Sequence, residues 1–306
     1  MKGADGLSGI LIVDKPAGWT SFDVIGKLRG VLHQRRLGHA GTLDPMATGV
    51  LPVFAGYATR ACGMLPSEDK AYTADFRLGQ ISDTQDSTGT VLETRPFSGI
   101  TADDITSVLP AGEIDQLPPM YSAVKVGGKK LYELARAGKE VARTPRRIMI
   151  YEMHLTAFDP STGEGQLTVS CGKGTYVRTL VHDMGQALGC GAVMTGLRRT
   201  AACGFTEAQS HTLEAIIAAA EAGTADTLVT PLEAAFASLP ALRLDARETD
   251  LYRNGVKLPL AGLGDRAADA ARYAVFGDPD GFLGTAVPDR EEGVLRVERN
   301  LSAPRA

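Results

Sequence analysis

Residues 39–49 read HAGTLDPMATG, and the interpretation of the whole chain depends on this stretch. Glycine, threonine and proline on both sides of Asp44 indicate a loop with a defined turn geometry. Catalytic groups concentrate on such loops when rigid elements flank them. We therefore interpret Asp44 as a candidate nucleophile or general base, and His39 as a nearby positioning group. The alternative is an aspartate that only caps a turn with its side chain.

The segments on either side of this loop have the patterns of regular elements. Residues 9–13 (GILIV) are apolar and predict a buried strand, and residues 50–54 resemble a second one. Between them we expect a helix over about residues 20–33, capped by Thr20. Its expected apolar stripe consists of Phe22, Ile25, Leu28 and Leu32.

The rest of the chain mixes strand and helix patterns. Residues 71–78 alternate between apolar and polar side chains, which predicts a half-buried strand. Further strands are expected at 147–158 and 165–171, and helices at 101–109 and 179–188. The 35 glycines and 16 prolines favour strands over helices. Together these patterns predict an α/β (α+β) fold.

The character of the chain changes near residue 239. An alanine-rich helix is expected at 213–222, followed by Leu239-Pro240, a short helix and hairpin-like segments. Residues 276–282 have turn-forming residues between two apolar runs. We therefore predict two domains, residues 1–238 and residues 239–306.

Composition limits the chemistry and the compartment. The four cysteines, Cys62, Cys171, Cys190 and Cys203, form no C-x-x-C pair, and no histidine spacing indicates a zinc site. The first apolar run, residues 10–13, is too short for a signal peptide or a membrane span. We expect a cytoplasmic protein with reduced thiols, no metal and no cofactor.

The net charge of −4 conceals an alternation along the chain. Residues 1–60 contain seven basic and four acidic residues, and residues 121–200 contain twelve and six. Residues 61–120 and 201–306 are acidic, with net charges of −7 and −6. Nucleic acids bind basic surfaces, and a sequence pI of about 5.8 does not exclude one. Charge alone leaves open whether these blocks only form solvated faces.

The stretch at residues 39–49 resembles the H-x-G-x-L-D-P-x-x-x-G motif of the TruB family of tRNA pseudouridine synthases. Six fixed positions within eleven residues rarely match by chance. The sister families that act on ribosomal RNA have a different sequence around the aspartate. Over about residues 8–205, further similar segments follow in the family's order: GILIVDKP (9–16), KAY (70–72), LGQ (78–80), DTQD (83–86), PPMYSAVK (118–125), GKGTYVRT (172–179) and LRR (197–199).

The resemblance implies that the protein is an isomerase that converts the T-loop uridine of tRNA, at position 55, to pseudouridine. The N-glycosidic bond breaks, the uracil turns, and its C5 joins the ribose, with no redox step and no energy input. The family assigns the nucleophile to Asp44 and its ion-pair partner to Arg178. Tyr72 is the family's candidate for abstraction of the C5 proton. The sequence leaves open whether Asp44 attacks the sugar C1′ or the base.

The resemblance also implies a substrate pocket for a base that is flipped out of the T-loop. Tyr72 and Tyr176 match tyrosines that line the uracil pocket, and Leu197 matches a pocket-wall position. His39 matches the histidine that takes the place of the flipped base, and Lys15 is a candidate contact to the RNA stem. Each residue alone is also compatible with ordinary packing or loop hydrogen bonding.

For the architecture, the resemblance implies a pseudouridine-synthase fold with a mixed, largely antiparallel central sheet, plus a small β-rich PUA-like C-terminal domain. Residues 121–150 resemble a thumb-like insertion that closes over the T-loop. The expected partner is the T-arm stem-loop of tRNA, with no membrane partner, and we expect a monomer. Phosphate contacts are expected from Lys125, Lys129, Lys130, Arg143, Arg146 and Arg147.

Two other functions compete with this interpretation. A non-catalytic RNA-binding protein on the same scaffold would keep the basic segments without needing Asp44. A hydrolase or lyase for a small glycoside would need paired carboxylates, and residues 39–49 supply one. Turnover by an asparagine variant separates the first alternative, and free uridine as substrate separates the second.

Overall fold

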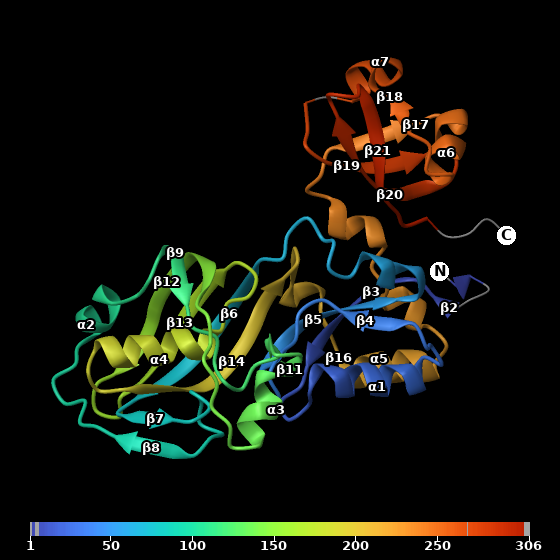
Figure 1. The fold of residues 1–306 in the computed structure, drawn as a ribbon. Helices are drawn as coiled ribbons and strands as arrows, with labels where there is room; N and C mark the ends of the chain where they lie inside the picture. Colours follow the sequence, from blue (N-terminus) through green and yellow to red (C-terminus); the bar gives the residue numbers. More distant parts are fainter. Residues whose placement is uncertain (1, 4–5, 268, 303–306) are drawn as a thin grey trace. The chain divides into compact units, whose positions relative to one another are not determined.

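The structure, a computed structural model, describes residues 2–3, 6–267 and 269–302 (Figure 1). The chain divides into two compact units. Unit 1 comprises Met1–Pro45, Val50–Ser67 and Cys203–Ala306, and unit 2 comprises Met46–Gly49 and Glu68–Ala202. The predicted boundary between domains 1–238 and 239–306 falls within unit 1 and stays a prediction. Residues 1, 4–5, 268 and 303–306 of those predicted domains lie outside the described residues.

The main sheet has ten strands and mixes parallel with antiparallel pairs. Its strands in order are β16 (His211–Thr212), β3 (Gly9–Lys15), β5 (Thr48–Ala55), β14 (Ala192–Ala202), β6 (Lys70–Leu78), β13 (Glu164–Cys171), β12 (Arg146–Asp159) and β9 (Gly112–Gln116), with β4 (Leu37–His39) and β15 (Phe205–Thr206) off this path. Strand β16 runs parallel to β3, and β14 to β5. Strand β6 is antiparallel to β14 and β13, and β12 is antiparallel to β13 and β9. The predicted mixed, largely antiparallel sheet is confirmed.

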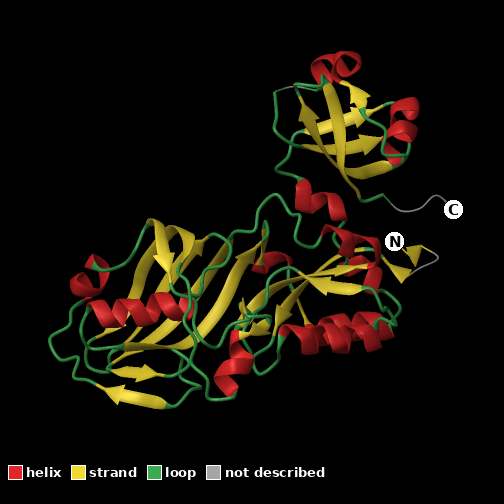
Figure 2. Ribbon diagram, viewed as in Figure 1, coloured by secondary structure: helices red, strands yellow, loops and turns green. Residues whose placement is uncertain are grey.

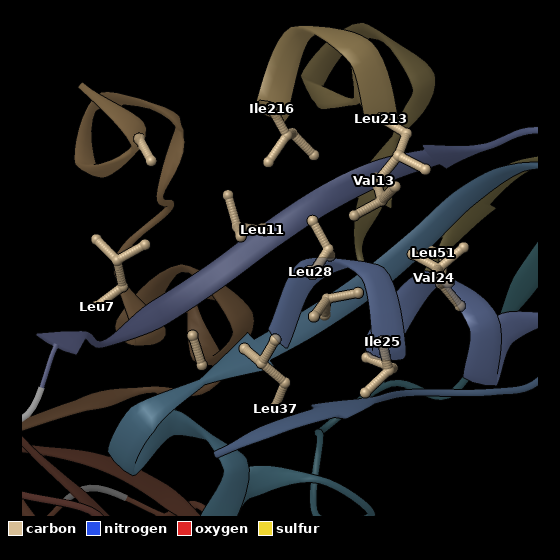
Figure 3. Close-up of a cluster of buried hydrophobic side chains, with 13 residues drawn as sticks. Leu7, Leu11, Val13, Val24, Ile25, Leu28, Leu37, Leu51, Leu213 and Ile216 are labelled. Carbon is tan, nitrogen blue, oxygen red and sulfur yellow. The ribbon is translucent and has the colours of Figure 1, made fainter. Parts of the chain in front are cut away.

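In unit 1, helices α1 (Ser21–Val31) and α5 (Leu213–Glu221) pack their apolar sides against strand β3 (Figure 3). The predicted cap at Thr20 is confirmed. The predicted apolar stripe was wrong at Phe22, which is 68% exposed. Val24 is buried instead, because it shares one helical face with Ile25 and Leu28. The buried cluster is Leu7, Leu11, Val13, Val24, Ile25, Leu28, Leu37, Leu51, Val53, Ala55, Leu213, Ile216 and Ala225.

The last part of unit 1 contains a separate five-stranded sheet. Its elements are β17 (Ala241–Leu244), α6 (Ala246–Arg253), β18 (Leu258–Pro259), α7 (Leu260–Leu263), β19 (Tyr273–Gly277), β20 (Gly281–Asp289) and β21 (Val294–Asn300). The turn predicted at 276–282 joins β19 to β20. The buried hydroxyl of Tyr252 donates to the carbonyls of Thr285 and Arg299, at 3.0 and 3.1 Å, and so links α6 to β20 and β21.

In unit 2, strand β6 alternates as predicted, with Tyr72, Ala74, Phe76 and Leu78 buried. Helix α4 (Val177–Ala187) begins two residues before its predicted start. The predicted helix in the acidic segment is α2 (Ala102–Ser107), and β7 (Gln80–Ser82) pairs with β8 (Val91–Thr94). Strand β14 was not predicted. Its alternation is interrupted by two register shifts against β6, at residues 194–196 and 199–201.

The predicted insertion at 121–150 contains a small hairpin and a short helix (Figure 2). Strands β10 (Lys125–Val126) and β11 (Lys129–Lys130) are joined by Gly127 and Gly128, with φ angles of 58° and 83°. Two successive positive φ angles are typical of a tight two-residue hairpin turn, in which glycine is favoured at both positions. Helix α3 (Leu131–Arg136) follows directly.

Short elements complete the fold: β1 (Lys2–Gly3), β2 (Gly6–Leu7), and the 3-10 helices η1 (Gly56–Ala61), η2 (Glu207–Gln209), η3 (Ala225–Leu228), η4 (Leu232–Phe236) and η5 (Gly264–Arg266). Among the described residues, no helix has the length and apolar character needed to cross a membrane.

Candidate active site

The loop that carries Asp44 is held by α1 and by the turn between β3 and α1. Asp44 is half-buried and lies in the connection between β4 and β5. Just before it, the Leu43 N–H donates to Ser21 Oγ at 2.9 Å. Just after it, the Pro45 carbonyl accepts the Gly18 N–H at 2.8 Å. Because the backbone is bonded on both sides of Asp44, the carboxylate belongs to a rigid segment.

The helix that supplies Ser21 is fixed at its first turn. The Asp23 N–H donates to Thr20 Oγ1 at 3.0 Å, and the Thr20 N–H donates to Asp23 Oδ2 at 2.8 Å. Hydrogen bonds from the Thr20 hydroxyl and amide lower the pKa of the Asp23 carboxyl. An ionised carboxylate at a helix N-terminus also interacts favourably with the positive end of the helix dipole. Ser21 therefore contacts the aspartate loop from an ordered turn.

Lys15 has a different place from the predicted one. Its side chain has no exposed surface, so a contact with the RNA stem is not supported. Its ammonium group donates to the carbonyls of Pro16 at 2.8 Å, Trp19 at 2.6 Å and Pro45 at 3.3 Å. A buried ammonium group requires such partners, because water is excluded from it. Lys15 thus ties the end of β3 to the residue that follows Asp44.

His39 lies at the other end of the same connection. It is the last residue of β4, is half-buried and pairs with Val53 of β5. The next residue, Ala40, donates its N–H to the carbonyl of Pro52 at 3.1 Å. His39 therefore lies directly before the short connection that contains Asp44, between two paired strands.

Two of the predicted pocket residues lie on neighbouring strands of unit 2. Tyr72 on β6 is 6% exposed and pairs with Arg199 of β14. Leu197, two residues along β14, is half-buried and pairs with Ala74. Residues opposite each other in an antiparallel pair share one face of the sheet. Tyr72 and Leu197 are therefore diagonal neighbours on the same face, as a shared pocket requires.

Arg178 and Tyr176 lie at the start of α4. Tyr176 is the half-buried N-cap residue, and Arg178, 4% exposed, follows in the first turn. The two Nη atoms of Arg178 donate to the carbonyls of Thr84 and Tyr121, each at 3.0 Å. Fixed hydrogen bonds on both branches of the guanidinium group give it a defined orientation.

Asp86 is a carboxylate to which the sequence interpretation gave no role. It is 4% exposed, and its Oδ2 lies 3.6 Å from Arg178 Nη1. Its Oδ1 accepts hydrogen bonds from the hydroxyls of Thr84 at 2.7 Å and Thr88 at 2.6 Å, and from the Thr88 N–H at 2.9 Å. Asp86 and the carbonyls of Thr84 and Tyr121 therefore orient the Arg178 guanidinium group together. The DTQD segment at 83–86 includes Asp86, but the sequence does not show that Arg178 is its partner.

Among the described residues, no group of three or more histidine, cysteine, aspartate or glutamate side chains could hold a metal ion. The candidate residues supply a carboxylate, an imidazole, an ammonium group, tyrosine hydroxyls and a buried guanidinium group. One unit holds Asp44, His39 and Lys15, and the other holds Tyr72, Tyr176, Arg178 and Leu197.

Comparison with known families gives the class of the protein. Residues 29–177 match the model described as the N-terminal domain of TruB family pseudouridylate synthases. Residues 178–237 match the model described as the C-terminal domain of tRNA pseudouridylate synthase B. The chain is thus a pseudouridylate synthase.

Similar whole proteins narrow this class. The chain is 43% identical over 301 residues to a tRNA pseudouridine synthase B of Ralstonia pickettii, covering 95% of this chain and 93% of that protein. It is 50% identical over 212 residues to a tRNA pseudouridine synthase B of Syntrophotalea carbinolica, covering 69% of each. The chain belongs to the TruB family.

Solved structures agree with the fold. A structure described as a Cbf5-Nop10-Gar1 complex contains a chain with a TM-score of 0.73 and 26% identity, covering 96% of this chain and 84% of that one. A structure described as an archaeal box H/ACA sRNP Nop10-Cbf5 complex gives a TM-score of 0.70 at 23% identity, covering 97% and 87%. The predicted pseudouridine-synthase fold is confirmed.

Proposed function

We propose that this pseudouridylate synthase acts on the T-arm stem-loop of tRNA and isomerises uridine 55, with Asp44 as the nucleophile. The observation that carries the proposal is the aspartate motif of the TruB family, on a loop anchored at both Leu43 and Pro45. The N1–C1′ bond breaks, the base turns while one fragment stays attached to the carboxylate, and C5 bonds to C1′. The proton lost from C5 is balanced by one gained at N1, so substrate and product are isomers.

For this chemistry Asp44 must stay ionised in a site from which the bound substrate excludes most of the water. Burial alone raises the pKa of a carboxyl group, and a close cation lowers it. We propose that Arg178 supplies that cation. Its burial and its two main-chain acceptors support this role, because a fixed guanidinium group loses little conformational entropy when it pairs.

We propose that Tyr72, Tyr176 and Leu197 receive the flipped uracil and that His39 fills the space it leaves. Flipping costs a few kcal/mol, and stacking on aromatic rings returns about 1–3 kcal/mol per base. The shared sheet face of Tyr72 and Leu197 supports a common pocket. We assign the abstraction of the C5 proton to the Tyr72 hydroxyl.

We propose that the insertion at 121–150 binds phosphates through part of its predicted basic set. Arg143 and Arg147 have carboxylate partners, Glu140 at 3.7 Å for the first and Asp115 at 3.8 Å for the second. Lys125 and Lys129 are exposed on the β10–β11 hairpin, and no salt bridge to either occurs within the described part of the chain. Lys125 and Lys129 are therefore better candidates than Arg143 and Arg147.

Replacing the two exposed hairpin lysines, Lys125 and Lys129, with glutamine should weaken RNA binding and make it less sensitive to salt. Removing one lysine–phosphate interaction lowers the slope of log affinity against log salt by roughly one. For Lys125→Gln with Lys129→Gln we expect a slope smaller by about two and an unchanged rate at saturating RNA. Binding titrations from low to moderate salt measure this. Lys257→Gln with Arg290→Gln is the control, because both residues already pair with acids, and an equal slope in the two double variants would contradict the assignment.

The predicted PUA-like domain, residues 239–306, is proposed to support the fold or to contact tRNA only peripherally. Most of its basic side chains are already paired with acids of the same domain. The ion pairs are Arg253–Asp280, Lys257–Glu292, Arg266–Glu248, Arg272–Glu298, Arg290–Asp269 and Arg296–Asp289. Charges neutralised in this way offer little attraction to phosphates. The monomeric state stays a prediction.

Chemical mapping of pseudouridine in tRNA tests the proposed function. In tRNA from cells that lack the protein we expect the modification to disappear at the T-loop position and to persist elsewhere. The purified protein should form pseudouridine at this position in an isolated T-arm stem-loop and leave free uridine unchanged. Loss at other tRNA positions, or no loss at position 55, would contradict the proposal.

A further inference from the structure

A buried glutamine side chain holds the backbone at the start of α4. Gln116, the last residue of β9, is 2% exposed. Its Nε2 donates to the carbonyl of Tyr176 at 3.0 Å, and its Oε1 accepts the Tyr176 N–H at 2.8 Å. One side-chain amide therefore binds both polar groups of one backbone residue, 60 positions away in the chain.

This two-point contact fixes Tyr176 more strictly than its helix does. Tyr176 is the N-cap residue of α4, and its side chain makes no capping hydrogen bond. Its carbonyl also accepts the N–H groups of Thr179 and Leu180, at 3.1 and 3.2 Å, but its own N–H points outside the helix. A single hydrogen bond would leave the residue free to rotate about that bond, whereas two bonds to a planar amide remove this freedom.

The start of α4, which carries the proposed catalytic groups, is also bonded to the base of the insertion at 121–150. Gln116 pairs with Arg146 of β12, so the chain leaves and re-enters the sheet at this point, on either side of the insertion. Further along the outgoing segment, the carbonyl of Tyr121 accepts a hydrogen bond from Arg178 Nη2 at 3.0 Å. Tyr176 and Arg178, two residues apart, are thus both bonded to the base of the insertion.

We propose that Gln116 is a positioning residue for the isomerisation. Its amide sets the backbone of Tyr176, and with it the direction of the phenol ring. Gln116 touches neither substrate nor reacting atoms in this proposal, which rests on the function proposed above. A displacement of about 1 Å at a catalytic group can cost roughly a hundredfold in rate.

The experiment compares Gln116→Leu with Gln166→Leu in single-turnover isomerisation of a saturating T-arm stem-loop. Gln166 is a matched control, because its half-buried amide also donates, to Asp75 Oδ1 at 2.9 Å, and accepts, from Thr156 Oγ1 at 3.2 Å. We expect the Gln116→Leu rate to fall about 10- to 100-fold, with less than a twofold change in the RNA dissociation constant. The Gln166→Leu rate should change less than twofold.

A double-mutant cycle identifies the residue through which Gln116 acts. In a Tyr176→Leu background, Gln116→Leu should add little further loss, because the ring that it positions is gone. Additive losses, or an equal loss in Gln166→Leu, would overturn the inference.

Gln116→Glu covers the case in which Gln116→Leu fails to fold. It keeps the acceptor for the Tyr176 N–H but sets a carboxylate oxygen against the Tyr176 carbonyl, so we expect an intermediate rate in a folded protein. A wild-type rate in this variant would also overturn the inference. The proposed function has a separate readout, which is whether the unaltered protein forms pseudouridine on the same RNA.

Discussion

Asp44→Asn should abolish isomerisation while RNA binding persists. An amide has the size of the carboxylate but is a very poor nucleophile, so the step that attaches one fragment of the substrate is lost. We expect the single-turnover rate to fall by on the order of 10³ or more, since removal of a nucleophile has effects at least this large in other enzymes. The loop should keep its shape, because its anchors at Leu43 and Pro45 use backbone atoms.

Rapid-quench measurement on a saturating T-arm stem-loop, with a parallel binding titration, checks this result. Asp103→Asn makes the same chemical change at an exposed position on α2 and should leave both quantities unchanged. A rate for Asp44→Asn within tenfold of the unaltered protein would show that the carboxylate is not the nucleophile. The protein would then fit the non-catalytic alternative only if the unaltered chain also lacked turnover.

Arg178→Met should reduce both activity and stability, for two separable reasons. Without the guanidinium group, nothing in the proposed mechanism keeps Asp44 ionised, and we expect a rate loss of roughly a hundredfold or more. The buried carboxylate of Asp86 also loses its cation, at a cost of about 3–5 kcal/mol in the free energy of unfolding.

Combining Arg178→Met with Asp86→Asn separates these effects. Removing both charges avoids an uncompensated buried carboxylate, so we expect the double variant to regain most of the missing stability in urea denaturation. Its isomerisation rate should stay as low as that of Arg178→Met. Recovery of activity together with stability would mean that Arg178 serves only the fold. Arg77→Met, which breaks an exposed pair with Glu164, is the control and should change stability by about 1 kcal/mol or less.

Local patterns predicted the elements whose signals lie within a few residues. The cap at Thr20, strand β3 and the alternation of β6 all follow from neighbouring side chains. Strand β14 could not be predicted in this way, because its two register shifts break the alternation that identifies a strand. Phe22 was misassigned because the spacing of Ile25 and Leu28 is compatible with a helical face that includes either Phe22 or Val24.

A site residue could be predicted from the sequence where a family motif contains it. It could not be predicted where its role depends on a partner that is distant in the sequence. The resemblance pointed to Asp44 and Arg178 by their positions in family segments. Asp86 and Gln116 act through partners tens of residues away in the sequence, so their roles required the folded chain. The sequence interpretation treated Lys15 as a surface cation, because nothing in its neighbourhood shows that three carbonyls enclose its ammonium group.

The enclosed ammonium group of Lys15 has a consequence for how substrates are distinguished. Since it joins β3 to the residue after Asp44, the order of the aspartate loop is established when the protein folds, and its entropic cost belongs to folding rather than to RNA association. In the mechanism proposed above, an arriving nucleotide therefore does not have to organise the attacking oxygen of Asp44. Discrimination between RNAs must then depend on which uridine can be delivered to a prearranged carboxylate.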